Sequence, residues 1–302
     1  MSGITAQVSL YPLGGNDLSP AIDAAIGELD RHGLERQTGA MSTVVCGDDE
    51  MVFSALLEAF RGAAARGQAV MVVTVSNACP WPARAAPGNG RALMAKIGPF
   101  EENAGKYDGW FAENRFAYES ELQAVGMLLP RPGTGVEIGV GTGRFAGRLG
   151  IRVGVEPSKS MRTIARDRGI TAVGGTAEAL PFRDGRFDFA VMVTVLCFFD
   201  DPDAALREAY RVLKPSGSLV VAFIDRASPL GKEYDARKAE SVYFRPATFY
   251  SGVEVAAMLK RAGFRTLDFR QTIFGDPDGM AGLDPVREGS GEGCFAVVRA
   301  DK

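Results

Sequence analysis

The residues whose types and spacing best fit a binding site lie between Val136 and Gly143. This segment reads Val-Glu-Ile-Gly-Val-Gly-Thr-Gly, an apolar strand that leads into three alternating glycines. Glycine has no Cβ atom, so a ligand can approach the backbone of such a turn closely. Two carboxylates accompany the turn: Glu137 precedes it, and Glu156 follows the next apolar strand. A strand-end carboxylate can accept hydrogen bonds from both hydroxyls of a ribose.

The elements that must hold these residues are predicted from hydrophobic periodicity. Beyond Pro130, apolar strands alternate with amphipathic helices, one of which begins at Pro202 after Asp200 and Asp201. The predicted strands cover residues 135–138, 152–155, 187–193, 218–223, 266–274 and 294–299, and a further helix covers residues 251–262. This alternation favours a largely parallel sheet with helices on both faces. In such a sheet, ligands bind outside the carboxyl ends of the strands.

Residues 1–80 show a different order of elements. Ile4, Ala6 and Val8 alternate with polar residues, which is typical of a strand with one apolar face. The segments that follow are a helix from Ser19, strands at residues 34–38 and 43–46, a helix after Asp48 and a strand at residues 69–75. The order βαββαβ predicts an α+β ferredoxin-like domain whose two helices cover only one face of the sheet.

A stretch rich in proline and glycine, residues 79–90, separates the two patterns and has no apolar period. Such a composition is typical of a linker. We therefore expect a first domain at residues 1–80, a linker at residues 81–99 and a second domain at residues 100–302. At 302 residues the chain is long enough to form two separate hydrophobic cores.

Composition argues against several classes of protein. Apolar residues make up 46% of the chain and charged residues 24%, as in ordinary folded proteins. A net charge of -3 argues against nucleic acid as a partner, and the apolar runs fall short of the ~20 residues of a membrane helix. Four cysteines without paired spacing predict neither a disulfide framework nor a metal site. The first residues carry no secretory signal, so we expect a cytoplasmic protein.

The glycine segment resembles the first motif of class I S-adenosylmethionine-dependent methyltransferases, and the similarity continues in order over residues 100–300. The resemblance implies an α/β Rossmann-like fold with a seven-stranded, mostly parallel sheet. It also implies S-adenosylmethionine (SAM) as the cofactor. In that family the positions of Glu137 and Gly139 lie at the methionine part of the cofactor, whereas Glu156 is the residue expected at the ribose.

Two further segments extend this resemblance. Residues 175–182 resemble the family's adenine-flanking segment, although Thr176 stands where an aspartate is common. The hydroxyl of Thr176 can still accept a hydrogen bond, and the Ala177 amide can donate one. Tyr107 lies in a segment, Tyr-Asp-Gly-Trp-Phe, that resembles the helix over the cofactor in small-molecule members. The implied cofactor contacts are Tyr107, Glu137, Gly139, Gly141, Gly143, Glu156, Pro157, Thr176, Ala177, Glu178 and Thr194.

The implied reaction is the transfer of a methyl group to a small molecule. Such in-line transfer depends mainly on alignment in a dry pocket, so a dedicated base is optional. The only histidine, His32, belongs to the first domain. Tyr107, Asp225 and Tyr234 are the candidate acid–base residues, since Asp200 is better explained as a helix cap. No residue pattern identifies the methyl acceptor.

The first domain resembles the YkoF-like thiamine-binding family in residues 7–13, 41–43 and 76–80. Members of that family are ferredoxin-like proteins that assemble through their open sheet faces and hold thiamine or its hydroxymethylpyrimidine part. The resemblance implies ligand contacts at Ser9, Tyr11, Ser42, Thr43 and Asn77. It also implies a homo-oligomer, and an oligomer interface alone would explain these polar residues equally well.

Two alternative functions remain open at this point. Residues 141–146 also satisfy the looser G-x-G-x-x-A pattern of dinucleotide-binding proteins, which would indicate an NAD- or flavin-dependent oxidoreductase. Alternatively, the glycine turn serves only tight packing, and the chain is a thiamine-responsive sensor whose second domain is not catalytic. Binding of SAM, NAD and thiamine distinguishes the three hypotheses.

Overall fold

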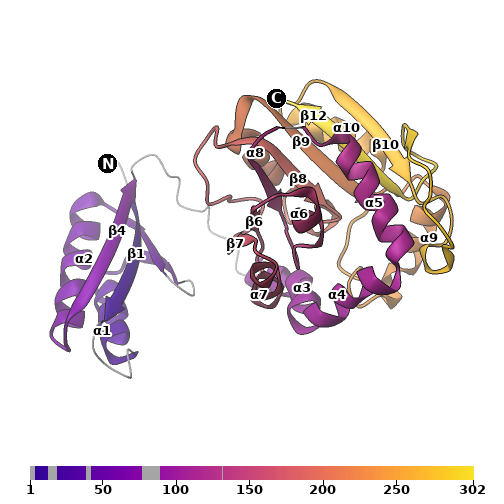
Figure 1. The fold of residues 1–302 in the computed structure, drawn as a ribbon. Coiled ribbons are helices and arrows are strands. Elements are labelled where there is room, and N and C mark those ends of the chain that lie inside the picture. The colour runs from indigo at the N-terminus through magenta and orange to yellow at the C-terminus, as the bar shows by residue number, and fades with distance from the viewer. Residues whose placement is uncertain (1–3, 13–18, 39–41, 77–88, 131) are drawn as a thin grey trace. The chain divides into compact units, whose positions relative to one another are not determined.

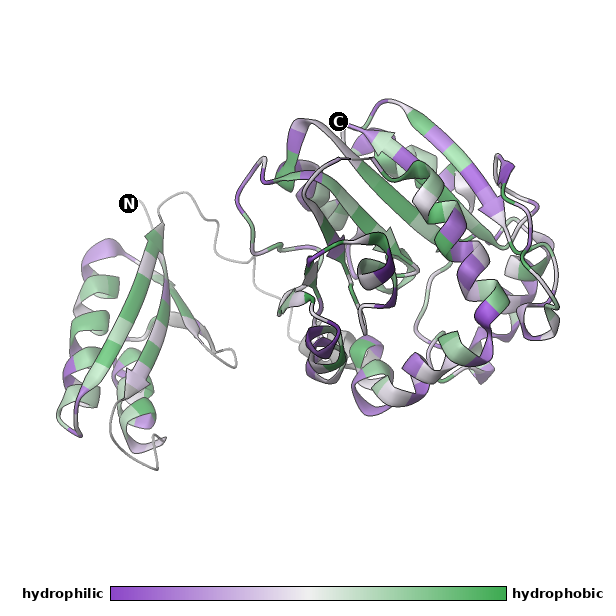
Figure 2. Cartoon of the chain, viewed as in Figure 1, coloured by the Kyte–Doolittle hydropathy of each residue, from purple (hydrophilic) through white to green (hydrophobic). Residues whose placement is uncertain are grey.

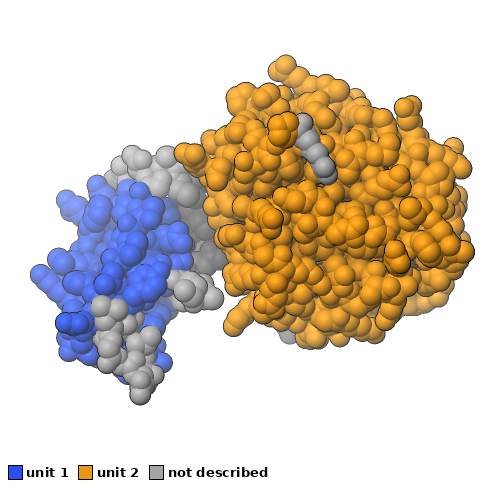
Figure 3. Space-filling view, viewed as in Figure 1, with its two compact units in different colours: residues 1–89 blue, residues 90–302 orange. Residues whose placement is uncertain are grey.

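The computed structural model describes residues 4–12, 19–38, 42–76, 89–130 and 132–302, and the chain divides into two compact units (Figure 1). The smaller unit is Met1–Asn89 and the larger unit is Gly90–Lys302 (Figure 3). Each unit has its own sheet and its own hydrophobic core. None of the described helices combines the length and the apolar character that a membrane crossing needs.

The smaller unit is an antiparallel sheet with two helices on one face (Figure 1). Its elements are β1 (Ile4–Pro12), α1 (Ser19–Arg31), β2 (Glu35–Thr38), β3 (Thr43–Gly47), α2 (Asp49–Ala64) and β4 (Ala69–Ser76). The strands lie in the order β2-β3-β1-β4, as expected of a βαββαβ unit. Ala6 and Val45 on the sheet pack against Val52, Ala55 and Ala59 of α2, and all five are fully buried. The ferredoxin-like prediction is thus confirmed.

The other face of this sheet carries neither α1 nor α2. Strand pairing places Tyr11 beside Val70 and Ser9 beside Val72. Val70 is 46% exposed and Val72 is 53% exposed. Polar side chains of β1 therefore lie next to exposed valines of β4, which makes this face a mixed polar and apolar surface.

Three helices open the larger unit: α3 (Asn89–Glu102), α4 (Ala104–Glu113) and α5 (Arg115–Leu128). Its strands are β5 (Gly135–Ile138), β6 (Val153–Val155), β7 (Thr171–Val173), β8 (Phe187–Val193), β9 (Leu213–Ile224), β10 (Leu267–Thr272), β11 (Arg287–Glu288) and β12 (Phe295–Asp301). The later helices are α6 (Arg144–Leu149), α7 (Lys159–Asp167), α8 (Pro202–Val212), α9 (Pro229–Arg237) and α10 (Gly252–Arg261), with short 3-10 turns η1 (Leu196–Phe198), η2 (Lys238–Glu240) and η3 (Pro277–Gly279).

The strands of the larger unit form one sheet in the order β11-β10-β12-β9-β8-β5-β6-β7 (Figure 1). The strands from β5 to β9 pair in parallel, while β12 pairs antiparallel with β9 and β10. The chain runs outward from β5 in both directions, so β5 marks the switch point where such sheets bind ligands. The Rossmann-like, mostly parallel sheet is confirmed. The sheet has eight strands where the resemblance implied seven, and the strands predicted from periodicity lack β7 and β11, which have only three and two residues.

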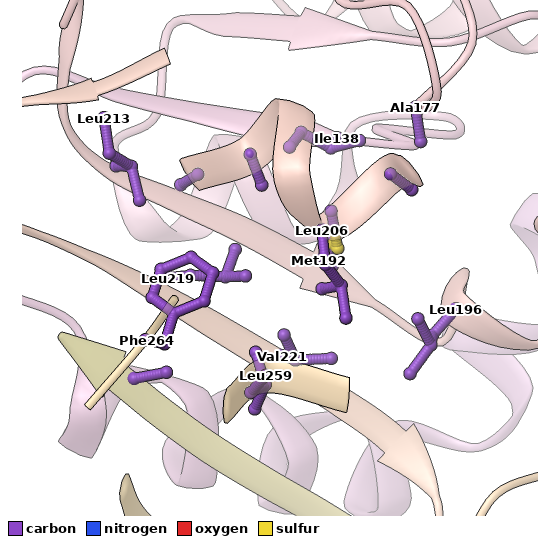
Figure 4. Packing of buried hydrophobic residues seen from close by; sticks show 14 of the residues in the cluster. Ile138, Ala177, Met192, Leu196, Leu206, Leu213, Leu219, Val221, Leu259 and Phe264 are labelled. Carbon is purple, nitrogen blue, oxygen red and sulfur yellow. The ribbon is translucent and has the colours of Figure 1, made fainter. Parts of the chain in front are cut away.

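Alternate residues of the central strands belong to two cores on opposite faces of the sheet. Met192 of β8 packs with Leu206 of α8 and Leu259 of α10 in one core (Figure 4). Its neighbour Val191 packs in the other core, which includes Val125 of α5. Because both faces are covered, the central strands are mainly apolar, and polar residues lie mainly on the outer helices (Figure 2).

The structure differs from the predicted linker at its C-terminal end. We expected residues 81–99 to lack regular structure, but α3 begins at Asn89. Residues 81–88 lie outside the described part of the chain. Lys96 of α3 pairs with Asp200 of the larger unit at 2.6 Å, so this helix is packed on that unit. Gly90, Gly98 and Pro99 within the helix conceal its periodicity in the sequence.

Candidate functional site

The glycine turn joins β5 to α6. Gly139, Gly141 and Gly143 all have positive φ values, of 74°, 51° and 81°. Gly139 is further constrained, because a Cβ atom there would lie 2.5 Å from Cγ1 of Val195. Any side chain at this position would be strained and would collide with the loop after β8. Gly143 forms the N-cap of α6.

Glu156 directly follows β6, the strand next to β5. Its Oε2 accepts a hydrogen bond from the Gly141 N–H at 3.0 Å, and its Oε1 accepts one from the Ser158 N–H at 2.9 Å. The residue is 8% exposed, and burial raises its pKa although both hydrogen bonds oppose that change. The predicted ribose carboxylate therefore lies against the glycine turn.

Glu137 lies within β5 and is 2% exposed. Its Oε2 has no hydrogen-bond partner among the described residues. Burial raises the pKa of Glu137 to about 8, although the Ala146 N–H bonds the carboxylate and acts in the opposite direction. A buried acceptor without a donor is costly, so a donor group from a bound molecule would stabilise this site.

A cavity of about 110 Å³ lies beside these groups at the carboxyl edge of the sheet. Val155 and Met161 give it an apolar wall, and Thr176 adds a hydroxyl on the segment after β7. Thr194, at the end of β8, also lines the cavity and has a φ of 51°. A β-branched residue in the left-handed region is strained, as is frequent at functional sites.

Aromatic rings from three segments close one side of the cavity. Phe100 of α3 is in ring contact with Tyr107 of α4, with Phe198 and with Tyr243, at centroid distances of 5.6, 5.0 and 5.2 Å. Tyr107 and Tyr243 are also in contact, at 5.8 Å. Phe100, Tyr107 and Phe198 line the cavity. Such contacts exclude water from the space beside the glycine turn.

Polar contacts fasten α3 over this site. The carboxylate of Glu101 accepts hydrogen bonds from the Ser158 hydroxyl at 2.6 Å and from the Ser160 amide and hydroxyl at 3.1 and 2.9 Å. Lys96 donates to the Phe199 carbonyl at 3.0 Å and pairs with Asp200. Helix α3 is thereby linked both to the start of α7 and to the loop after β8.

A second network fixes α4 to the glycine turn. Asp108 accepts hydrogen bonds from the Thr142 hydroxyl at 2.7 Å, from Arg144 at 2.7 and 2.8 Å and from Arg168 at 2.6 Å. Burial disfavours the charge of Asp108, but these hydrogen bonds outweigh it and hold its pKa well below the usual range. Because Asp108 follows Tyr107, the network also positions the Tyr107 ring.

The three candidate acid–base residues lie in different places. Tyr107 lines the cavity, and burial together with the charge of Glu121 raises its pKa above the usual range. Asp225 follows β9 and is fully buried, with Oδ1 accepting from the Ala227 N–H at 2.9 Å and Oδ2 without a partner among the described residues. Tyr234 of α9 stacks on Phe244. Neither Asp225 nor Tyr234 is among the residues that line the cavity.

Most of the predicted cofactor contacts come together. Those that line the cavity are Tyr107, Gly139, Gly141, Glu156, Pro157, Thr176, Ala177, Glu178 and Thr194. Glu137 does not line it because it is buried within β5, and Gly143 is turned into the packing against Ala165. Asp201 caps α8 through a hydrogen bond from the Ala204 N–H at 2.9 Å, whereas its neighbour Asp200 pairs with Lys96.

Sequence reasoning missed the contribution of α3. Lys96, Ile97 and Phe100 all line the cavity, although this stretch was expected to be a linker. The available signal was the spacing of Leu93, Ile97 and Phe100, four and three residues apart, which is a helical stripe. Met161 was also missed, because nothing in α7 distinguishes a cavity-facing methionine from a core one.

The predicted ligand residues of the smaller unit do not all come together in one place, unlike most of those of the larger unit. Ser42 accepts a hydrogen bond from the Gln7 side chain at 3.0 Å, and Ser9 and Tyr11 lie on the same strand as Gln7. Tyr11 is 44% exposed, whereas Thr43 is buried. Asn77 lies outside the described residues. The roles of these five residues stay predictions.

Comparison with known proteins gives two family matches. A family described as a methyltransferase domain matches residues 136–221, which contain the glycine turn, Glu156 and Thr194. A second, the YKOF-related family, matches residues 4–81. The two matches fall in different compact units of the chain.

Individual relatives extend this comparison. One crystal structure is of a SAM-dependent methyltransferase and possible histamine N-methyltransferase from Thermotoga maritima, with 51% identity and a TM-score of 0.67 over 68% of this chain and 99% of that chain. A protein of Methanocaldococcus jannaschii is 44% identical over 203 residues, which are 67% of this chain and 98% of the relative. The ubiquinone/menaquinone biosynthesis C-methyltransferase UbiE of Escherichia coli is 32% identical over 157 residues, 42% of this chain and 61% of that enzyme.

Proposed function

The chain belongs to the SAM-dependent methyltransferases, and on that premise we propose that its larger unit transfers the methyl group of SAM to a small molecule. The observation that supports the proposal is the cavity at the switch point of the sheet, where Glu156 lies against the glycine turn. Two buried carboxylates beside the turn, Glu137 and Glu156, suit a cationic nucleoside. The same charges would repel the pyrophosphate of a dinucleotide.

The residues present fit SAM in chemical type. Glu137 does not line the cavity, so its unpaired Oε2 would meet the ammonium group of SAM through water, whereas the Glu156 carboxylate can accept from two hydroxyls. Thr176, Ala177 and Glu178 line the cavity on the side that would hold the adenine, next to the apolar side chain of Met161. When bound, SAM supplies an electrophilic methyl group on a positively charged sulfur.

The chain's own residues contribute alignment and a dry environment. Phe100, Tyr107 and Phe198 cover the cavity and exclude water from it. Gly139 has no side chain and so allows the loop after β8 to approach the glycine turn closely, and Thr194 at the start of that loop adopts a strained backbone conformation. The raised pKa keeps the Tyr107 hydroxyl protonated far into the alkaline range, so it can donate a hydrogen bond that orients a ligand.

Titration calorimetry on the full chain tests this proposal. We expect SAM to bind and NAD not to bind. Glu156→Ala removes a carboxylate that would make charge-assisted hydrogen bonds, so its SAM affinity should fall by roughly 10- to 100-fold. The control is Glu102→Ala, an exposed glutamate of α3, which should bind SAM as the wild type does. Undiminished binding by Glu156→Ala, or no binding by the wild type, would contradict the proposal.

The methyl acceptor is a separate question. The Thermotoga maritima protein is a possible histamine N-methyltransferase, which makes histamine the first acceptor to test with this chain. UbiE methylates carbon in quinone biosynthesis according to its name, so a quinol is the second compound to test. Transfer of a labelled methyl group to either compound would identify the class of acceptor.

For the smaller unit we propose binding of thiamine or its hydroxymethylpyrimidine part, and assembly of a homo-oligomer through the open sheet face. The match of residues 4–81 to the YKOF-related family supports the ligand. Exposed Val70 and Val72 beside Tyr11 and Ser9 support an interface, because a mixed apolar and polar face suits association.

Two measurements on the full chain separate these proposals. Titration with thiamine should give saturable binding that Ser42→Ala weakens, since Ser42 is bonded to Gln7 on the open face. Sedimentation should show an oligomer that Val72→Asp dissociates, because a charge would be buried in the interface. Thiamine binding that Ser42→Ala leaves unchanged would contradict the ligand site, and a wild-type monomer would contradict the interface.

A further inference from the structure

Strand β4 lies at one edge of the sheet of the smaller unit, and among the described residues it pairs with β1 alone. Its sequence, Ala-Val-Met-Val-Val-Thr-Val-Ser, contains no charged residue and no proline, and the strand is mainly apolar (Figure 2). Natural edge strands usually carry charged residues or proline, because a free edge can pair with another chain. The β4 edge therefore lacks the usual protection against pairing.

The hydrophobic core of the smaller unit is open at the same edge. Strand pairing places Val73 beside Val8 and Val75 beside Ala6. Val8 and Ala6 are buried in the core beneath the helices, so the two valines of β4 lie on the same, helix-covered face of the sheet. Yet Val73 is 36% exposed and Val75 is 39% exposed. The two helices thus leave the β4 end of the core uncovered.

Helix α2 carries an apolar ridge on the side that faces away from α1. Phe53, Leu57 and Phe60 are four and three residues apart and form one stripe, although their exposed fractions are 55%, 49% and 36%. Gly62 marks the side of α1, because a Cβ atom there would lie 3.4 Å from the side chain of Glu28. Since Gly62 follows Phe53 by about two and a half turns, the ridge points in the opposite direction.

The ridge and the open end of the core lie on the same side of the unit. Helix α2 packs on β4 and β1, and α1 lies on its other side (Figure 1). We call this surface the β4-edge patch; its members are Phe53, Leu57, Phe60, Val73 and Val75. Strands are about 4.8 Å apart and packed helices about 8–10 Å apart, so two strands are as wide as one helix. A second sheet that paired with β4 would bring its own helix to packing distance from α2.

We propose that β4 pairs antiparallel with β4 of a second copy of this chain, so that the two α2 helices pack ridge to ridge. This interface is separate from the proposed contact through the open sheet face. Helix α2 has 16 residues and β4 has 8, which makes their lengths about 24 and 26 Å. Because they run in opposite directions, their midpoints, at Leu57 and at Val72 and Val73, lie side by side. One two-fold axis can therefore pass beside both, as an interface between identical copies requires.

Charge also favours a second copy as the occupant. Helix α2 has Asp49 and Glu50 in its first turn and Arg61 in its last turn. A two-fold axis beside the middle of the helix sets the first turn of each copy next to the last turn of the other. Arg61 bonds Glu58 of its own helix through Nη1 at 2.7 Å, and its other nitrogens can reach Glu50 of the second copy. Such pairs add little affinity but fix the antiparallel orientation, which the helix dipoles also favour.

Sedimentation equilibrium of the full chain tests the inference. We expect Leu57→Asp to halve the mass of the wild-type assembly, because a charge would be buried at the centre of the ridge contact. Met51→Asp is the matched control on the same helix. Met51 is 44% exposed, and a Cβ atom at Gly47 of β3 would lie 4.0 Å from its sulfur, so it lies away from the β4 edge. This variant should keep the mass of the wild type.

Chemical cross-linking provides a second measurement. In a chain with Cys46 and Cys79 replaced by serine, Leu57→Cys should form a covalent dimer with a short thiol-specific cross-linker, whereas Met51→Cys should stay uncoupled. A mass that Leu57→Asp leaves unchanged, or a Leu57→Cys chain that does not couple, would overturn the inference. A monomeric wild type would also overturn it and would assign the β4-edge patch to another occupant. Assembly through the open face alone would be dissociated by Val72→Asp and kept by Leu57→Asp, so the two interface proposals fail separately.

Discussion

Buried carboxylates dominate the chemistry of individual residues in the larger unit. Glu137 and Glu156 lie beside the glycine turn, and both are buried. Both have raised pKa values because burial disfavours their charged forms. Ionisation of each of these carboxylates in the folded state therefore lowers the stability of the protein, and a bound cationic ligand can offset that loss. Ligand affinity and the pH dependence of stability are linked for this reason.

Glu137→Gln gives a prediction about stability. The pKa of Glu137 is about 8 in the folded protein and near 4.5 when unfolded, so the folded state holds the proton more tightly. The stability of the wild type should therefore fall as the pH rises between these values. The variant should not show this fall, because glutamine cannot ionise. We expect the variant to equal the wild type at pH 4 and to exceed it above pH 8, by on the order of 1–3 kcal/mol.

Urea denaturation of both proteins across this range is the measurement. The difference between them isolates Glu137 from the other titrating carboxylates. SAM binding should meanwhile weaken in the variant, since a carboxamide cannot pair with an ammonium group. A difference in stability that does not change with pH would contradict the assignment.

Asp108→Asn tests the network that fixes α4. The substitution would keep the shape of the side chain but leave Arg144 and Arg168 without their shared negative partner. Loss of one partner from a partly buried ionic network should lower the unfolding free energy by about 2–3 kcal/mol. SAM affinity should fall as well, because Tyr107 loses its support. The control is Asp184→Asn, an 80% exposed partner of Arg211, which should change stability by less than about 1 kcal/mol.

The stability that the Asp108 network contributes should change with pH in the opposite direction to that expected for Glu137. The pKa of Asp108 is depressed in the folded protein, so its contribution is complete above the ordinary value of 3.8 and is lost as the pH falls below it. The wild type should thus lose its advantage over Asp108→Asn in acid. An advantage that persists at pH 2 to the same extent as at pH 7 would contradict the ionic role.

At the scale of elements, α3 has the clearest functional consequence. Phe100 is the ring that joins α3 to Tyr107, Phe198 and Tyr243. Phe100→Ala should open the cavity to water and raise the SAM dissociation constant by roughly tenfold, mainly through faster dissociation. Stopped-flow displacement of bound cofactor measures that rate. Phe116→Ala, which removes a 37% exposed ring of α5, is the control and should leave the rate unchanged.

Sequence periodicity predicted the elements that carry strong local patterns. The strands Gly135–Ile138 and Phe187–Val193 have the predicted bounds, because each is a buried apolar run bordered by turn residues. Strand β9 begins at Leu213, five residues before the predicted start, since the turn Lys-Pro-Ser-Gly conceals an extended segment. Helix α9 and the turn η2 lie in the region 226–249, for which no element was predicted.

The candidate site was predictable only in part. Glycines with positive φ and carboxylates at strand ends leave a signal in the chain, so Gly139, Gly141 and Glu156 could be named. Met161 could not, because a methionine that faces the cavity and one that faces the core occupy the same helical spacing in the sequence. The pairing of Lys96 with Asp200 likewise joins residues 104 positions apart, a contact that no local pattern encodes.

At the scale of the whole molecule, the two units have separate cores, and every residue that lines the cavity belongs to the larger one. S-adenosylhomocysteine should therefore stabilise only the larger unit, by mass action. Differential scanning calorimetry should show two transitions, of which one shifts upward with ligand concentration. A single transition, or an equal shift of both, would show that the units unfold together.

The position of α3 also determines where the chain can be divided for laboratory work. Its helical residues begin at Asn89, and Lys96, Ile97 and Phe100 belong to the cavity. A recombinant fragment that starts at residue 100 would keep the entire sheet and lose Lys96 and Ile97, and purification alone would not reveal the defect. The cut for a truncated enzyme therefore belongs before Asn89, and crystallisation trials are best begun from that fragment.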